Sequence, residues 1–230
     1  MGPLRRAHRP DRLAVARARG FTLIEMLVSL AILTIIAVIV LTSHASFTNS
    51  LIVTNAAYDV ALSLRQAESF GVSSRNSGAI ANAGYGIDFS TANLSSYVLF
   101  VDNHPNNCGP GSLPSCKPGN GVYNAGADGL VSTYTINAGI GVSKLCVYRG
   151  GSSYCSGGGS NLFALDIVFT RPNTAANIAF LKNAALYPGD QGPGDPLTGA
   201  CITLSTPDGT SQRGISVSSV GQVSPVASCP

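Results

Sequence analysis

A run of apolar residues near the start of the chain constrains its fold more than any other feature. From Phe21 to Leu41 the sequence has 21 residues and a single charged side chain, Glu25. A helix rises about 1.5 Å per residue, so a run of this length matches the roughly 30 Å hydrocarbon core of a bilayer. Residues 21–41 therefore predict a transmembrane helix.

Charge is distributed unevenly around this segment. Six arginines precede Gly20, opposed there only by Asp11, and the next Lys or Arg after the apolar run is Arg65. Segments rich in Lys and Arg stay in the cytoplasm, so we expect a single-pass protein of the inner (cytoplasmic) membrane with everything after Leu41 outside the cytoplasm. Without the first twenty residues the net charge falls from +3 to about −2, because 8 Lys and Arg remain against 10 Asp and Glu.

The helical pattern continues beyond the apolar run. Neither Gly nor Pro occurs between Phe21 and Phe70, so nothing local ends a helix there. Small or apolar residues then recur at spacings of four and three, which places them on one helical face: Val53, Ala57, Val60, Leu64, Ala67 and Gly71. We expect one helix over residues 21–75, whose second half packs on a soluble domain of residues 76–230.

A cleaved secretory signal peptide is the alternative interpretation of this region. Ser43-His44-Ala45 resembles a cleavage site of small residues, and a cut after Ala45 would release a soluble secreted protein. Against it, the apolar run is longer than the usual 7–15 residues of a signal peptide and begins with a carboxylate.

The start of the apolar run carries a family resemblance. Gly20-Phe21-Thr22-Leu23-Ile24-Glu25, followed by Met26-Leu27-Val28, resembles the signature of type IV prepilins. The resemblance implies that residues 1–20 are a leader, that prepilin peptidase cuts between Gly20 and Phe21, and that the new amine of Phe21 is N-methylated. It also implies a structural subunit of a filament.

Glu25 is the one charged residue in the apolar run. An acidic side chain at mid-bilayer costs about 2.5–3.5 kcal/mol on insertion scales, so intramembrane charges normally have partners. The amine that cleavage would create at Phe21 of a neighbouring subunit supplies one, which makes Glu25 a candidate assembly residue. The alternative is a carboxylate that reaches the lipid headgroups at the bilayer edge.

Beyond residue 75 the sequence changes to short alternating runs separated by turn residues, which predicts strands. Candidate strands are Tyr85–Phe89, Ser96–Val101, Val131–Ile136, Gly141–Tyr148 and Leu162–Phe169. Residues 202–205 and 215–218 flank the turn Pro207-Asp208-Gly209 and predict a hairpin, which Gln222–Val226 extends to a three-stranded meander. The fold class is therefore α+β, with a long helix on an antiparallel, sandwich-like, pilin-like domain.

Three further segments resemble the GspH/FimT class of minor pilins and pseudopilins. They are Ile167-Val168-Phe169-Thr170-Arg171-Pro172, the pair Arg213–Val217 with Gly221-Gln222-Val223, and Leu62–Glu68 on the helix. The resemblance implies a subunit of a type IV pilus or a type II secretion pseudopilus. Its partners would be other pilins or pseudopilins and an inner-membrane assembly platform.

A tip adhesin or DNA-binding minor pilin is the alternative within this class. DNA-binding members carry arginines after the last glycine, where this chain has Gln222, Val223 and Ser224. A phosphate backbone also requires several cations on one face, and the charge after the leader is slightly negative. We therefore do not expect nucleic acid as a partner.

All six cysteines lie in the C-terminal part of the chain: Cys108, Cys116, Cys146, Cys155, Cys201 and Cys229. An even number outside the cytoplasm predicts disulfides. Six cysteines allow fifteen pairings, of which nearest-neighbour pairing (108 with 116, 146 with 155, 201 with 229) is the simplest. Zinc is a poorer interpretation, because there is no CxxC pair.

Few residues are candidates for catalysis or for binding a metal ion. Asp190 and Asp195 lie in a Gly- and Pro-rich segment that reads as a solvated loop, although closely spaced carboxylates could bind calcium. After the leader only His44 and His104 remain, and no GxSxG, HExxH or phosphate-binding loop is present. We expect no enzyme activity, no cofactor and no metal.

Overall fold

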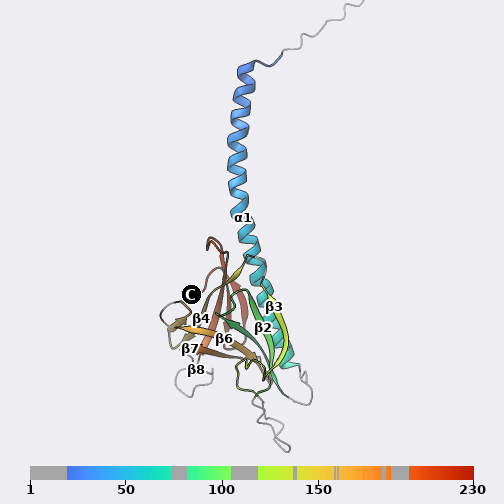
Figure 1. The fold of residues 1–230 in the computed structure, drawn as a ribbon, viewed down its shortest axis with the longest axis vertical. Helices are drawn as coiled ribbons and strands as arrows, with labels where there is room; N and C mark the ends of the chain where they lie inside the picture. The colour runs from blue at the N-terminus through green and yellow to red at the C-terminus, as the bar shows by residue number, and fades with distance from the viewer. Residues whose placement is uncertain are drawn as a thin grey trace, which may run out of the picture. The chain divides into compact units, whose positions relative to one another are not determined.

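A computed structural model describes residues 20–73, 82–104, 119–136, 139–157, 159, 161–172, 174–182, 185–187 and 197–230, without the side chains of 42–46 and 185–187. The chain divides into two compact units, Met1–His44 and Ala45–Pro230. A single helix, α1 (Leu23–Val72), contributes its first part to one unit and its second part to the other (Figure 1).

The second part of α1 forms one wall of the core of the larger unit. The stripe that the spacing predicts is buried there, together with Ala56 and Ala61. These residues are mostly small, so the helix approaches the strands closely. At Gly71 the approach is closest, because a Cβ atom placed there would lie 2.2 Å from the backbone oxygen of Phe169.

In the described parts of the larger unit, eleven strands form two antiparallel sheets that pack on the second part of α1 (Figure 1). The six-stranded sheet has the order β3 (Gly129–Thr135), β2 (Ser96–Asp102), β1 (Gly84–Ser90), β6 (Leu162–Phe169), β7 (Ala176–Lys182) and β8 (Ala185–Tyr187). The five-stranded sheet has the order β11 (Val223–Val226), β10 (Gln212–Ser218), β9 (Leu197–Ser205), β4 (Gly141–Arg149) and β5 (Ser152–Cys155).

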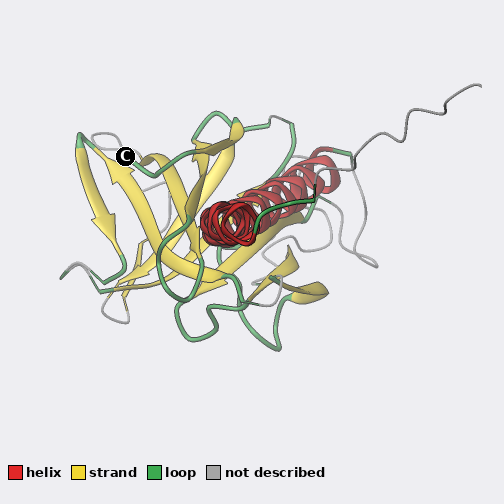
Figure 2. Cartoon of the chain, turned by 90° about the horizontal axis from the view of Figure 1, so that it is seen from above, coloured by secondary structure: helices red, strands yellow, loops and turns green. Residues whose placement is uncertain are grey.

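Side chains from both sheets and from α1 form one hydrophobic cluster. The helix is bonded to both sheets: the hydroxyls of Ser63 and Tyr97 on β2 are 2.9 Å apart, and Arg65 donates to the carbonyl of Val223 on β11 at 2.9 Å. Figure 2 looks along the helix, with strands flanking it. The α+β class with an antiparallel, two-sheet domain is therefore confirmed.

The predicted strands are all present, and the C-terminal meander is β9, β10 and β11 in adjacent positions. Three further strands were not predicted, namely β5, β7 and β8. β7 reads Ala-Asn-Ile-Ala-Phe-Leu-Lys, which lacks a clear alternation of polar and apolar residues. It is nevertheless an interior strand between β6 and β8, and there the sheet context outweighs intrinsic preference.

Candidate functional site: the N-terminal helix

The residues of the predicted cleavage site lie at the exposed start of α1. Gly20 and Phe21 precede the helix, and the Phe21 side chain is 76% exposed. The hydroxyl of Thr22 accepts a hydrogen bond from the backbone N–H of Glu25 at 3.3 Å. Thr22 is therefore the N-cap of the helix, and Glu25 is the acidic residue in its first turn.

This cap is a feature that the sequence analysis missed. The order Thr-x-x-Glu from residue 22 to residue 25 is the pattern of a capping box, in which a Ser or Thr cap is followed three residues later by Glu. Part of the prepilin-like motif thus has a local structural role, because it starts the helix directly after the predicted cut. Glu25 has a favourable position at the positive end of the helix whatever else it contacts.

From Leu23 to Leu41 the helix is apolar and no part of it is buried. Its length and composition suffice to cross a membrane. A core helix of a soluble protein would instead bury one face. Apart from Glu25 in its first turn, this segment therefore has an apolar surface on all sides, which suits surroundings of lipid or of other apolar helices.

An exposed apolar stripe continues along the part of α1 that belongs to the larger unit. Phe47, Leu51, Tyr58 and Leu62 are 62%, 47%, 55% and 63% exposed. Their spacings of four, seven and four residues place them on one helical face, and the buried stripe lies on the opposite face. One face of this part of α1 therefore packs on the strands, while the opposite face has apolar side chains that the described residues leave exposed.

Among the described residues, two disulfides involve strands of the five-stranded sheet. Cys146 is joined to Cys155 across the β4–β5 hairpin, and Cys201 on β9 is joined to Cys229 near the C-terminus. These are two of the three nearest-neighbour pairs. Cys108 and Cys116 lie outside the described residues.

Asp88, Asp102, Asp128 and Asp166 form an acidic group that sequence reasoning did not single out. Asp166 on β6 and Asp102 on β2 are 1% and 4% exposed. Asp166 accepts a hydrogen bond from the N–H of Tyr123, and Asp102 accepts from the N–H groups of Asn120 and Gly121. The fourth member, Asp128, accepts from three further backbone N–H groups. This group therefore anchors the segment 119–128 to the sheet.

Burial controls the ionisation of this group. Desolvation raises the pKa of Asp88 and of Asp102 to about 6, against hydrogen bonds that lower them. Desolvation, followed by the charge of Asp88, raises the pKa of Asp166 well above its usual value. Among the described residues no group of three or more His, Cys, Asp or Glu side chains is arranged to hold a metal ion.

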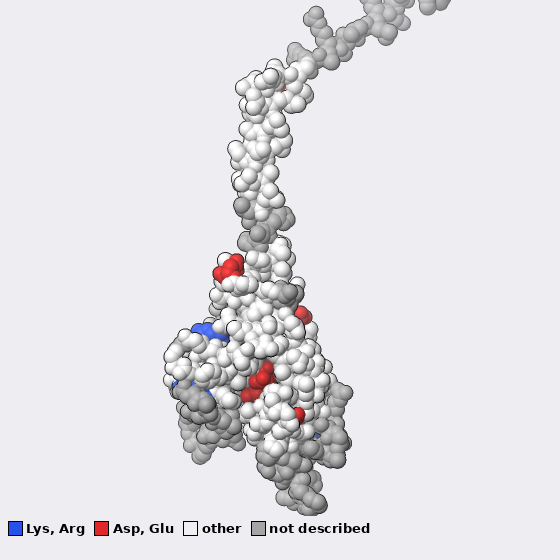
Figure 3. Space-filling view, viewed as in Figure 1, with Lys and Arg blue, Asp and Glu red and all other residues white. Residues whose placement is uncertain are grey.

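Of the remaining candidate residues, the structure fully describes only His104. The backbone N–H of His104 donates to Asp128, while Asp190 and Asp195 lie outside the described residues and the side chain of His44 is not described. The face in Figure 3 shows isolated charged side chains rather than a broad basic area on its described surface.

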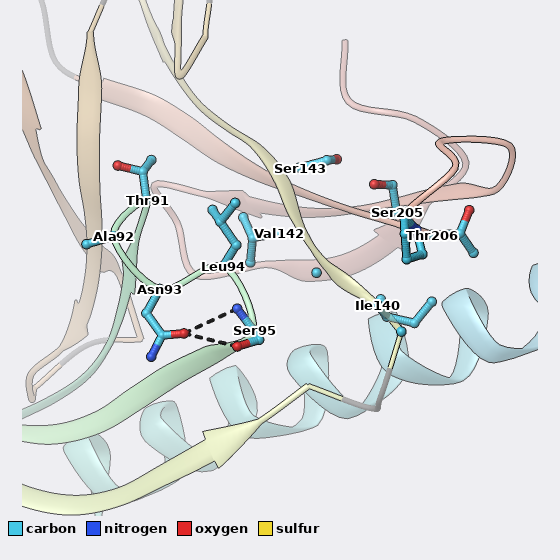
Figure 4. A pocket seen from close by; sticks show the side chains of 13 residues that line it. Thr91, Ala92, Asn93, Leu94, Ser95, Ile140, Val142, Ser143, Ser205 and Thr206 are labelled. Atoms are coloured by element: carbon cyan, nitrogen blue, oxygen red, sulfur yellow. Dashed lines mark hydrogen bonds between the residues drawn. The ribbon is translucent and has the colours of Figure 1, made fainter.

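A cavity of about 720 Å³ lies beside the turn between β1 and β2 (Figure 4). Its polar lining consists of one amide and five hydroxyl side chains: Asn93, Thr91, Ser95, Ser143, Ser205 and Thr206. The amide oxygen of Asn93 is occupied by hydrogen bonds from the backbone and hydroxyl of Ser95. None of the described residues that line it has an ionisable side chain.

Comparison with known proteins adds one result. Residues 15–41 match the family model of the prokaryotic N-terminal methylation motif, which covers the predicted cleavage site and the apolar segment of α1. No curated protein and no solved structure matches the chain. The methylation motif and the apolar helix that contains it support a type IV prepilin-like protein, a class whose members are structural.

Proposed function

We propose that this chain is a minor pilin or pseudopilin, a subunit of a type IV pilus or a type II secretion pseudopilus. Prepilin peptidase removes residues 1–20, and the amine of Phe21 is then N-methylated. The protein sits in the inner membrane through residues 21–41, with its larger unit outside the cytoplasm, until it moves into the filament. The observation that carries this proposal is the methylation motif at residues 15–41 on an unburied apolar helix.

The exposed stripe of α1 supports assembly rather than simple anchoring. A membrane anchor needs apolar side chains only across the bilayer, yet Phe47, Leu51, Tyr58 and Leu62 extend the apolar surface into the larger unit. Helices of neighbouring subunits would cover this face in a filament. Exposed apolar patches of this kind mark interaction surfaces.

The three segments that resemble GspH/FimT proteins support the minor-subunit part of the proposal. All three contact or lie on α1: Arg65, within Leu62–Glu68, donates to the carbonyl of Val223, and Phe169 lies against Gly71, three residues beyond that helix segment. Arg213 on β10 also donates to the hydroxyl of Thr54 on α1 at 3.1 Å. Residues scattered along the sequence therefore join the helix to both sheets, as expected if they are determinants of a shared fold.

The experiment is to produce the full chain with and without prepilin peptidase and to measure the intact mass. We expect the peptidase to shorten the chain to a product that starts at Phe21. Gly20→Val should block the cut, because it replaces the smallest residue with a branched one at the cleaved bond, and Ala18→Val is the matched control. A product that starts at Ser46, or a mass that the peptidase does not change, would contradict the proposal.

The second measurement is whether the processed chain is incorporated into filaments. Filaments sheared from cells that make the complete assembly system should contain the processed chain in substoichiometric amounts relative to the main subunit. If the processed chain stays entirely in the membrane fraction while filaments form normally without it, the filament role is wrong.

A further inference from the structure

The two sheets have four edge strands, and three of these are protected against pairing with another chain. β8 has only three residues. β5 has four and is tied to β4 by the disulfide Cys146–Cys155. β11 has four, includes Pro225, and its Val223 carbonyl accepts a hydrogen bond from Arg65. Short strands, proline and covering groups are the usual ways in which proteins protect sheet edges.

The fourth edge strand, β3, lacks these protections. It has seven residues, Gly-Leu-Val-Ser-Thr-Tyr-Thr, with no charge and no proline. A register shift opposite Leu99 and Phe100 disturbs its beginning, but from Ser132 to Thr135 the pairing with β2 is regular. Leu130 and Val131 are 60% and 43% exposed. A long, uncharged edge with exposed apolar side chains is a ready template for an added strand.

The hydrogen-bond pattern identifies which backbone groups of β3 are open. The N–H of Ile136 donates to the carbonyl of Ser95 at 2.8 Å, and Thr135 lies opposite Ser96. Residues in an antiparallel pair alternate between bonded and non-bonded positions. Tyr134 therefore bonds to β2, whereas the N–H and C=O groups of Thr133 and Thr135 point away from it. Within the described parts of the chain these groups have no hydrogen-bond partner.

The inner face of β3 holds the strand in place without closing its edge. Tyr134 stacks on Tyr97 with ring centroids 5.3 Å apart, and its hydroxyl donates to the side chain of Gln66 on α1 at 3.0 Å. Gln66 lies four residues from Leu62, so it adjoins the exposed apolar stripe of the helix. The open edge and that stripe therefore lie on adjacent surfaces.

We propose that β3 is a docking edge, which pairs through Thr133 and Thr135 with an extended, uncharged backbone segment of a different pilin-like subunit. The proposal rests on the proposed function. Strand addition of this kind uses main-chain hydrogen bonds for affinity. A different subunit is the occupant because antiparallel pairing of two β3 strands would invert one copy, and its α1 would then run opposite to that of its neighbour. Subunits anchored in one membrane have their helices in the same direction.

Amide hydrogen exchange tests the pairing directly. In the full-length chain in detergent, we expect the amides of Thr133 and Thr135 to exchange rapidly and the amide of Tyr134 to be protected. In assembled filaments all three should be protected, with exchange at Thr133 and Thr135 slowed at least about tenfold. Unchanged exchange at these two residues in filaments that contain the chain would overturn the proposal. Protection of both in the purified chain alone, with dimer formation, would show that a second copy is the occupant and overturn the assignment to a different subunit.

A proline variant provides the functional test. Thr133→Pro removes an outward N–H, which β2 does not use, so we expect normal thermal unfolding and normal cleavage but at least a tenfold loss of incorporation into filaments. Thr133→Val, which keeps the N–H, is the matched control and should be incorporated normally. Normal incorporation of Thr133→Pro would reject the docking edge and leave the filament role intact, whereas absence of the unaltered chain from filaments would reject the proposed function itself.

Discussion

Asp88 on β1 and Asp166 on β6 are direct cross-strand partners, and their carboxyl groups are joined by a hydrogen bond. Two carboxylates so close and so buried cannot both be charged without a large cost, so the pair retains a proton at a pH where exposed aspartates have lost theirs. Asp102 and Asp128 add further negative charge near Asp166.

This pair predicts that the larger unit loses stability as pH rises. The pKa of Asp88 is about 6 in the folded protein against 3.8 for an ordinary aspartate, and that of Asp166 is raised as well. A raised folded-state pKa stabilises the fold below the unfolded-state pKa and ceases to do so as pH rises through the folded-state value. The free energy of unfolding should therefore fall between about pH 4 and pH 7, as measured by urea unfolding at a series of pH values.

Asp88→Asn should flatten this pH dependence, because the amide donates to the Asp166 carboxylate through N–H groups that do not titrate in this pH range. Asp208→Asn is the matched control, since Asp208 is fully exposed and its hydrogen bonds to Thr206 and Thr210 lower its pKa. A free energy of unfolding that rises from pH 5 to pH 7, or one whose slope Asp88→Asn leaves unchanged, would contradict the assignment.

Gly71→Ala should destabilise the larger unit although alanine favours helices by about 1 kcal/mol over glycine. The added Cβ would lie 2.2 Å from the Phe169 oxygen, and relieving such a contact typically costs about 1–3 kcal/mol. Chemical denaturation measures the difference. Ser69→Ala on the exposed side of the same turn is the control, and equal stability of the two variants would show that the close approach is unimportant.

The disulfides should contribute unequally. Cys201 and Cys229 are 28 residues apart, and Cys146 and Cys155 only nine. Because a longer loop loses more conformational entropy when it is closed, replacing Cys201 and Cys229 by serine should cost more, within a typical 2–4 kcal/mol, than replacing the other pair. Thermal unfolding of the two double variants tests this order, and the reverse order would argue for a mainly enthalpic effect.

Glu25→Ala should leave cleavage and membrane insertion intact but remove the chain from filaments. Removing a charge from an apolar helix favours insertion, whereas assembly loses the partner proposed for the Phe21 amine. Thr22→Ala separates this role from helix capping, because it removes the cap and keeps the carboxylate. We expect Thr22→Ala to assemble. Normal levels of Glu25→Ala in sheared filaments would favour a carboxylate that reaches the headgroups instead.

Much of the N-terminal helix could be predicted from sequence, because the information for it is local. The apolar run, the arginines before it and the motif from Gly20 to Glu25 lie together in one continuous stretch of the sequence. The buried stripe from Val53 to Gly71 follows from helical periodicity alone. The strong turn Pro207-Asp208-Gly209 likewise determines the β9–β10 hairpin.

The tertiary structure determined the contacts between residues that are distant in sequence. Cys146 lies opposite Cys155 on β5 and opposite Cys201 on β9, so proximity alone would permit either bond. In the structure Cys146 is bonded to Cys155, and Cys201 is bonded to Cys229. Asp88 and Asp166 are 78 positions apart in the sequence and become neighbours only when β1 pairs with β6. The open edge of β3 also depends on the sheet order, because a strand sequence does not specify which of its sides will have a neighbour.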